Sequence, residues 1–275
     1  MALKHILIAV PTMGGLVKAK TTTTLVLLMR QLTRAGVEAE YLNIDASDIV
    51  YARNFFACEV LRSKTLDGLL FVDSDMQFRP ALVLKMLQRD VDVAAAAYPK
   101  RLLDLGRFSS AVARTGAVST QAAAQALASA YQYTIIPSWE SPKLDQIKVD
   151  RGFARMAAVG MGCTLISRNA LRAMIDAQVV RPRKDILNGV EQRGWGFFDH
   201  LTVQDVTLSE DYSFCYRWTQ LLGRELWVNV DEAVSHLGDF AYQGRFVDRL
   251  AGSAARASAP PAIDLEGQAV VDAKA

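Results

Sequence analysis

The sequence has little cysteine and histidine, and it has no long hydrophobic run. Its 275 residues include three cysteines and three histidines. Cys58, Cys163 and Cys215 are odd in number and widely spaced, which is typical of buried free thiols in a reducing compartment and not of a disulfide framework. No segment reaches the roughly 18 unbroken apolar residues of a membrane helix. The apolar run near the N-terminus is too short for a signal peptide, so we expect a cytoplasmic protein without a transmembrane segment.

An excess of charge of one sign is also missing. The chain carries 31 basic and 29 acidic side chains, a formal net charge of +2, which gives no general case for nucleic acid as the main partner. Two phosphate-binding signatures are absent as well. The segment 11–15 after the first apolar run lacks G-x-G-x-x-G, and Lys20–Thr21 does not end a phosphate loop.

Apolar runs alternate with amphipathic segments through the first hundred residues. The predicted strands are residues 5–10, 37–44, 68–72 and 91–97, and the predicted helices are residues 21–35, 49–63 and 80–89. This alternation indicates an α/β fold with a mainly parallel sheet covered by helices. Ligands of such sheets bind at the carboxyl ends of the strands, where the 11–15 loop and Asp73–Asp75 lie.

The rest of the chain is less regular. We predict helices over residues 117–131, 168–178 and 210–222, strands over 157–166 and 226–230, a surface loop over 135–150 and a turn over 235–238. Residues 181–206 show few periodic apolar positions and predict a mobile loop that closes over ligands. We expect one domain over residues 1–250, with two halves over about 1–110 and about 111–250. Residues 251–275 are rich in small residues and predict a disordered tail.

Two carboxylates directly follow the third predicted strand. Asp73 and Asp75 stand one residue apart in LLFVDSDMQFRP, so both can face the same ligand. Paired carboxylates can hold a hard divalent cation, which neutralises a diphosphate leaving group. The alternative is that Asp and Ser form a turn before the next helix, and the motif alone favours that turn.

Three ordered blocks resemble GT-A glycosyltransferases, especially the family-2-like enzymes of bacteria and phages. The blocks are YARNFFACEVL…DGLLFVDSDMQFRPALVLKML, VGMGCTLISRNAL and WGFFD…LSEDYSFCYRWTQLLGRELWVNVDEAVSHLG, and together they span most of residues 5–245. The resemblance implies the GT-A fold, a Rossmann-like nucleotide-sugar-binding domain with a mixed, mainly parallel sheet flanked by helices. It implies a donor-binding half over about 1–110 and an acceptor-side half over about 111–250, and a location in the host cytoplasm if a phage encodes the protein.

The resemblance implies a catalytic and metal-binding set. Asp211 matches the aspartate that accepts the proton of the acceptor hydroxyl in inverting members, and Glu210 stands beside it. Asp73, Asp75 and His236 match the positions that hold Mn²⁺ or Mg²⁺, and imidazole suits manganese beside carboxylates. The alternative for Glu210 and Asp211 is helix capping after Ser209, and a lone histidine is more often structural than a ligand.

The resemblance and the order of elements also indicate residues that contact the donor and the acceptor. The resemblance and the position in the fold place six residues at the donor nucleotide: Pro11, Thr12, Arg53, Asn54, Asp73 and Ser74. Trp195 is a candidate stacking platform for the acceptor or an anchor in the core. Tyr98 and Lys100 follow the fourth strand, where they contact acceptor or phosphate or form a solvated loop.

The implied function is metal-dependent transfer of a sugar from a nucleotide diphosphate donor, UDP before GDP, to a hydroxyl acceptor. The acceptor is a glycan, a small molecule or a modified DNA base, and a phage-type enzyme that glycosylates a hydroxymethylpyrimidine is one alternative. A nucleotidyltransferase is the alternative of another class, since it also uses paired carboxylates and a metal. A non-catalytic sugar-nucleotide-binding relative is disfavoured because Asp73, Asp75 and Asp211 are all present.

Overall fold

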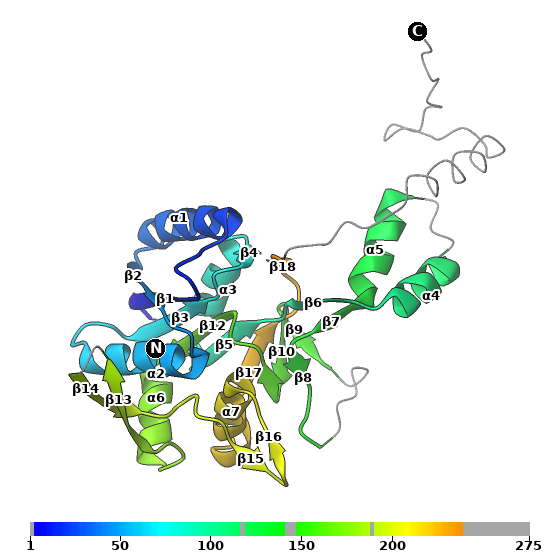
Figure 1. Ribbon diagram of the computed structural model, residues 1–275. Coiled ribbons are helices and arrows are strands. Elements are labelled where there is room, and N and C mark those ends of the chain that lie inside the picture. Colours follow the sequence, from blue (N-terminus) through cyan, green and yellow to red (C-terminus); the bar gives the residue numbers. More distant parts are fainter. Residues whose placement is uncertain (1–2, 116–118, 141–146, 188–189, 239–275) are drawn as a thin grey trace, which may run out of the picture. The chain divides into compact units, whose positions relative to one another are not determined.

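The computed structural model describes residues 3–115, 119–140, 147–187 and 190–238, which all belong to one compact unit, Met1–Gly238. The expected disordered tail and the end of the expected domain lie outside the described residues. An eight-stranded mixed sheet forms the centre (Figure 1). In spatial order its strands are β2 (Glu38–Asp45), β1 (His5–Thr12), β3 (Gly68–Val72), β12 (Cys163–Ser167), β5 (Val93–Ala96), β17 (Leu226–Asn229), β10 (Phe153–Met156) and β9 (Val149–Asp150).

The strands of this sheet run mainly in one direction. β1 pairs in parallel with β2 and β3, and β5 pairs in parallel with β17. β12 enters antiparallel between β3 and β5, and β10 is antiparallel to both β17 and β9. The α/β class with a mixed, mainly parallel sheet is therefore confirmed. The inserted β12 matters for the site, because its first residues lie beside the last residue of β3, with Cys163 opposite Val72.

Helices cover both faces of the sheet (Figure 1). One face packs against α1 (Ala19–Arg34) and α3 (Ala81–Arg89), and the other packs against α2 (Ile49–Arg62), α6 (Arg168–Asp176) and α7 (Glu210–Tyr216). Alternate residues of β1 point to opposite faces: Ile6 and Ile8 belong to the first core and Leu7 and Ala9 to the second. Burial on both faces explains why the central strands read as continuous apolar runs.

Smaller elements complete the described fold. They are the strand pairs β4 (Met76–Phe78) with β18 (Val234–His236), β6 (Pro99–Leu103) with β7 (Tyr131–Tyr133), β8 (Ile135–Ile136) with β11 (Ala158–Val159), β13 (Pro182–Leu187) with β14 (Val190–Trp195) and β15 (Thr202–Val203) with β16 (Val206–Thr207), the helices α4 (Leu105–Thr115) and α5 (Thr120–Ala130), and the π-helix η2 (Arg217–Leu221). Within the described ranges, no helix has the length and apolarity needed to cross a membrane.

Two local expectations were wrong, the lack of regular structure at 181–206 and the turn at 235–238, and one helix was not predicted; motion of residues 181–206 over ligands stays a prediction. Residues 181–206 form two antiparallel strand pairs, β13–β14 and β15–β16, because backbone pairing fixes a segment that has little apolar periodicity. The expected turn at 235–238 begins in strand β18, which pairs with β4. Helix α4 was missed, since its sequence LGRFSSAVART holds two serines and a glycine that weaken the helical signal.

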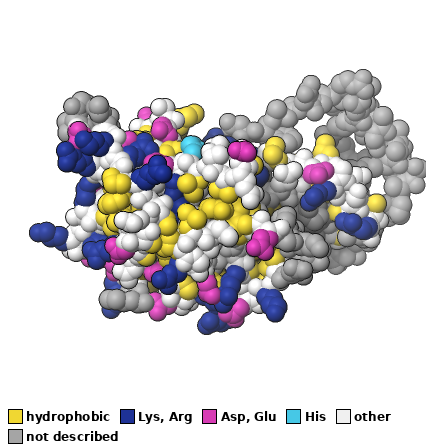
Figure 2. Space-filling view, turned by 90° about the horizontal axis from the view of Figure 1, so that it is seen from below, with side chains coloured by type: hydrophobic (Ala, Val, Ile, Leu, Met, Phe, Trp, Pro, Cys, Tyr) yellow, Lys and Arg dark blue, Asp and Glu magenta, His cyan; other side chains and the backbone are white. Residues whose placement is uncertain are grey.

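Figure 2 shows the face of the molecule that points downward in Figure 1. Hydrophobic side chains gather in the middle of this face, and basic and acidic side chains are interspersed around them. The three cysteines are free and buried, as the sequence indicates.

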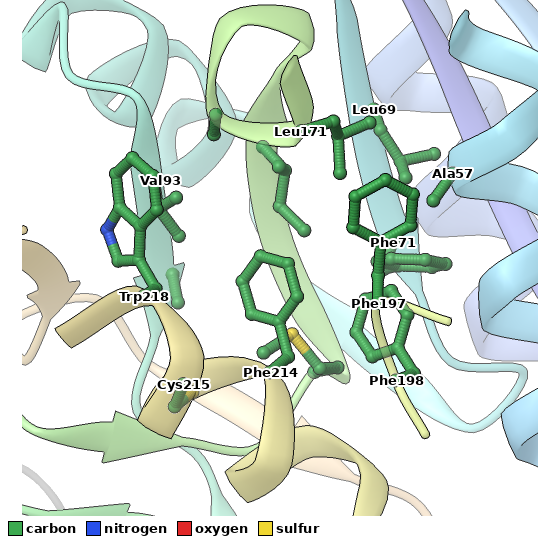
Figure 3. Close-up of a cluster of buried hydrophobic side chains, with 14 of the residues drawn as sticks. Ala57, Leu69, Phe71, Val93, Leu171, Phe197, Phe198, Phe214, Cys215 and Trp218 are labelled. Carbon is green, nitrogen blue, oxygen red and sulfur yellow. The ribbon is translucent and has the colours of Figure 1, made fainter. Parts of the chain in front are cut away.

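The core below the sheet is built on aromatic rings (Figure 3). Phe198, which is 0% exposed, stacks on Phe214 with ring centroids 4.9 Å apart. It meets Phe71 of β3 edge to face at 5.5 Å. This cluster joins β3, α7 and the segment after β14, so it supports the strand that carries Asp73.

Replacing Phe198 with alanine should therefore leave a cavity at this junction. We expect Phe198→Ala to lower the free energy of unfolding by about 3–5 kcal/mol, measured by urea denaturation. Met13→Ala is the control, because Met13 is 76% exposed and should change stability by less than about 0.5 kcal/mol. A loss below about 1 kcal/mol in Phe198→Ala would contradict the packing described.

Candidate active site

The turn at the carboxyl end of β3 is hydrogen-bonded to the segment before β12 and to the segment before α1. The Asp73 N–H donates to the carbonyl of Gly162 (3.0 Å), just before β12, and the Met76 N–H donates to the carbonyl of Asp73 (3.1 Å). The Lys18 N–H, after the 11–15 loop, donates to the carbonyl of Ser74 (2.9 Å). The Asp-Ser-Asp segment is thus a tight turn and also adjoins the loop after β1, so its structural and ligand-binding interpretations are compatible.

A buried arginine joins two of the sequence blocks at this turn. Arg53 of α2 has a side chain that is 4% exposed, and its Nη2 donates to Asp73 Oδ1 at 3.1 Å. Its Nε lies 3.5 Å from Glu210 Oε1 at the start of α7. Burial lowers the pKa of Arg53, but the charges of Asp73 and Glu210 outweigh it, so the guanidinium remains a cation.

One side of the Arg53 guanidinium is left free. Its Nη1 is buried and has no hydrogen-bond partner in the described part of the chain. Buried N–H groups of charged side chains are costly when unpaired, so this nitrogen is suited to an anionic ligand group.

The second carboxylate of the motif lies against a histidine. Asp75 Oδ2 is 3.3 Å from His236 Nε2 and 3.4 Å from Arg101 Nη1. Burial raises the pKa of Asp75, but the hydrogen bond and charge of His236 and the charge of Arg101 outweigh it, so the net shift is downward. The hydrogen bond to Asp75 raises the pKa of His236 against the opposing effect of burial. Pairing of β18 with β4 creates this contact, with His236 opposite Met76.

Asp75 and His236 form the part of the site that fits a divalent cation. Their Oδ2 and Nε2 atoms face one another, and His236 Nδ1 lies 3.0 Å from the carbonyl of Pro99. A carbonyl partner at Nδ1 orients the ring, and Nε2 could bind a metal once it gives up the proton that it shares with Asp75. Asp73 is turned to Arg53 instead, and the described ranges hold no group of three or more histidine, cysteine or acidic residues placed to bind a metal together.

Helix α7 begins with the two acidic residues. The Ser209 side chain makes no capping bond to the helix backbone and instead donates to Asp211 Oδ1. The same oxygen accepts the Tyr212 N–H at 2.7 Å. Burial raises the pKa of Asp211, and the charge of Glu210 raises it further against the lowering effect of Ser209 and Arg53. A carboxylate with a raised pKa near other charged groups is a candidate base.

Two predicted donor residues use their side chains within the protein. Thr12 is 3% exposed and donates to the carbonyl of Ile44 (2.9 Å). Asn54 is 2% exposed, accepts the Phe198 N–H and donates to Asp199, each at 2.9 Å. In this conformation the Asn54 side chain is not available to a nucleotide, and its position explains how α2 anchors the segment after β14. Pro11 is also buried at the end of β1.

The three predicted acceptor residues lie in different surroundings. Trp195 ends β14, its N–H donates to the sulfur of Cys58 (3.3 Å), and its ring packs partly buried against the core. Among its described contacts none is with Asp73, Asp75 or Asp211, so the structure favours the anchoring interpretation. Lys100 is exposed on β6. Tyr98 is 5% exposed, so it is not in a solvated loop.

The sequence did not predict the roles of two arginines, Arg101 and Arg217. Arg101 follows the fourth predicted strand with Tyr98 and Lys100, where the sequence allows a contact with acceptor or phosphate or a solvated loop, and nothing in the sequence pairs it with Asp75. Arg217 is 4% exposed, and it donates to the carbonyls of Val179 (3.2 Å) and Phe197 (3.1 Å), which fixes both ends of the β13–β14 segment to η2. An arginine within an apolar helical stretch is the one signal that could have found it.

No protein-family model matches the chain, and no curated protein matches it by sequence. Among solved structures, A197 from STIV matches with a TM-score of 0.45 and 14% identity, over 86% of this chain and 86% of that chain. The inositol-1-phosphate CTP transferase from T. maritima matches with a TM-score of 0.40 and 8% identity, over 92% of this chain and 96% of that chain. GalNAc-T7 with UDP, GalNAc and Mn²⁺ matches with a TM-score of 0.40 and 11% identity, over 88% of this chain and 45% of that chain. Similarity at this level identifies neither a family nor an activity.

The raised pKa of Asp211 makes a prediction about stability. Because the folded-state pKa lies above the ordinary value of 3.8, ionising Asp211 costs folding free energy as pH rises through this window. We expect Asp211→Asn to unfold at a higher temperature than the parent at pH 7, with a gain that disappears below about pH 3.8. Thermal unfolding across this pH range measures it, and a variant less stable than the parent at pH 7 would rule out the burial effect.

Proposed function

We propose that the chain is a metal-dependent glycosyltransferase of the GT-A fold that moves a sugar from a UDP-sugar to a hydroxyl acceptor. The observation that carries this proposal is the link from Asp73 through Arg53 to Glu210. It places carboxylates from two distant sequence blocks at the carboxyl edge of the sheet, where ligands of α/β proteins bind. Two of the three sequence blocks that resemble this class, the first and the third, supply these residues.

The donor would lie between the loop after β1 and the Asp-Ser-Asp turn. The Lys18–Ser74 hydrogen bond joins these two segments, and Gly14 and Gly15 have φ of 68° and 65°, which allow the backbone a close approach to a nucleoside. Arg53 Nη1 is buried and has no partner among the described residues, so it would pair with a diphosphate oxygen if donor binding opens a path to it. Pro11, Thr12 and Ser74 remain predicted donor contacts through their backbone or position.

Asp75 and His236 would hold the cation, with the donor diphosphate completing its ligands. Mn²⁺ is the first choice because it accepts both imidazole and carboxylate, and Mg²⁺ is the second. When bound, the cation would neutralise charge on the leaving diphosphate. Arg101 already offsets the charge of Asp75 at 3.4 Å, so it would have to share or release this carboxylate.

Asp211 is the proposed general base. In this reaction the acceptor oxygen bonds to the anomeric carbon of the sugar, and the bond from that carbon to the diphosphate oxygen breaks with its electron pair leaving on the diphosphate. The acceptor proton passes to Asp211. Burial raises the pKa of Asp211, which makes its carboxylate a stronger base. This role implies inversion at the anomeric carbon.

The overall charge of the chain bears on the class of acceptor. The formal net charge is only +2, and a long DNA contact would need an extended basic surface. We therefore favour a glycan or small-molecule hydroxyl over a modified DNA base.

The products of turnover test the proposed reaction. With UDP-sugars, Mn²⁺ and a mixture of hydroxyl acceptors, we expect the parent to release UDP and Asp211→Asn to be about 10²–10⁴-fold slower. Asparagine keeps the shape of the side chain, so both proteins should bind UDP equally. Release of inorganic diphosphate from a nucleoside triphosphate and a sugar phosphate would instead show a nucleotidyltransferase, and equal rates in both proteins would exclude the base role.

The metal role of Asp75 has its own test. We expect Asp75→Ala to lose the Mn²⁺-dependent part of UDP binding, because the cation loses a direct carboxylate ligand. Titration calorimetry with UDP, with and without Mn²⁺, measures this. Glu38→Ala is the control, since Glu38 is an exposed carboxylate at the opposite end of the sheet. Equal metal dependence in Asp75→Ala and the control would remove Asp75 from the site.

A further inference from the structure

Tyr98 contacts two parts of the candidate site: Gly162, which adjoins Asp73, and His236, which adjoins Asp75. It lies between β5 and β6 and is 5% exposed. Its phenolic oxygen accepts the N–H of Gly162 at 3.1 Å. Its ring packs almost perpendicular to the imidazole of His236, with centroids 5.5 Å apart and planes at 88°. Burial raises the pKa of Tyr98, and the charge of Asp73 raises it further, so the side chain is a neutral phenol at working pH.

Two glycines make room for this phenol. A Cβ atom on Gly162 would lie 2.9 Å from Tyr98 Cζ and 3.1 Å from Asp73 Oδ2. A Cβ atom on Gly160 would collide with the Tyr98 hydroxyl. The segment before β12 can therefore approach both Tyr98 and Asp73 only because positions 160 and 162 lack side chains. This requirement accounts for the glycine pair in VGMGC.

The backbone of Gly162 links Tyr98 to the Asp-Ser-Asp turn through two hydrogen bonds. Gly162 donates its N–H to Tyr98 and accepts the N–H of Asp73 at its carbonyl, at 3.0 Å. Tyr98 thus holds the residue that holds the first carboxylate of the turn. Without the phenolic oxygen, the Gly162 N–H would be left buried and unpaired, which costs about 1–3 kcal/mol or forces the segment to shift.

The other contact reaches His236. The carbonyl of Pro99, the residue after Tyr98, lies 3.0 Å from His236 Nδ1, and the Tyr98 ring packs against the same imidazole. The Tyr98 backbone is itself fixed, since its carbonyl accepts the Thr134 N–H at 3.2 Å. Together these contacts set the direction of Nε2 toward Asp75.

We propose that Tyr98 is a positioning residue that fixes His236 and the Asp73–Asp75 turn relative to one another, so that a divalent cation meets a preformed pair of ligands. This inference rests on the proposed metal role of Asp75 and His236. It assigns Tyr98 no contact with metal or sugar. Its hydroxyl acts on the carboxylate side through Gly162, and its ring acts on the histidine side, so two substitutions separate the two contacts.

The test uses Mn²⁺ alone and the histidine signals of the full chain. Three histidines in the sequence give three imidazole spin systems in a ¹⁵N-correlated spectrum, and bound Mn²⁺ should broaden those of His236 while sparing those of His5 and His200. Tyr98→Phe keeps the ring and removes the hydroxyl, and we expect it to need about tenfold more Mn²⁺ for the same broadening. Tyr98→Leu removes both contacts, so we expect a loss of up to about 100-fold and a shifted His236 signal. Tyr133→Phe is the control, because Tyr133 is 41% exposed.

The outcomes separate this inference from the proposed function. Parent-like Mn²⁺ dependence in Tyr98→Phe and Tyr98→Leu, with His236 broadened in all three proteins, would overturn the positioning role and leave the metal site standing. Failure of Mn²⁺ to broaden His236 in the parent would overturn the metal assignment and the role of Tyr98 in it. If Tyr98→Leu does not fold, the Tyr98→Phe titration decides alone.

Discussion

The candidate site depends on the ion pairs that the buried guanidinium of Arg53 makes with Asp73 and Glu210. Three charged side chains meet at the carboxyl end of β3, and Arg53 is 4% exposed between Asp73 and Glu210. Two carboxylates at this edge would repel each other without the cation between them. The charge pair thereby brings α7, with Asp211 at its start, to the same place as the Asp-Ser-Asp turn. Breaking such a pair from one side leaves a buried charge uncompensated.

The histidine side of the site depends on topology in addition to charge. The antiparallel insertion of β12 between β3 and β5 places Gly162 beside Asp73. Return of the chain from β17 to β18 places His236 beside Asp75. Both pairings are between segments far apart in the sequence, and Tyr98 lies where they meet. Backbone hydrogen bonds therefore hold the segments that carry Asp75 and His236, and the Arg101 contact with Asp75 is the one that the proposed cation would have to displace or share.

Much of the fold of the first hundred residues could be predicted from the sequence. The apolar run 68–72 gave the bounds of β3 because both of its faces are buried, which leaves a continuous hydrophobic signal. The hairpin β13–β14 could not be predicted, since PRKDIL and VEQRGW are held by cross-strand backbone bonds and not by apolar periodicity. Asp75 and His236 were proposed together from the resemblance, whereas the Arg101 contact and the burial of Asn54 depend on tertiary packing that no local pattern encodes.

The central claim is that a divalent cation and a nucleoside diphosphate bind at the edge formed by β3, β18 and α2. The most direct measurement is anomalous diffraction at the manganese edge from crystals grown with UDP and Mn²⁺. The account predicts one strong peak within bonding distance of Asp75 Oδ2 and His236 Nε2, with diphosphate density at Arg53 Nη1. A peak at another site, or UDP bound away from Arg53 with Asp75 still paired only to His236 and Arg101, would contradict it.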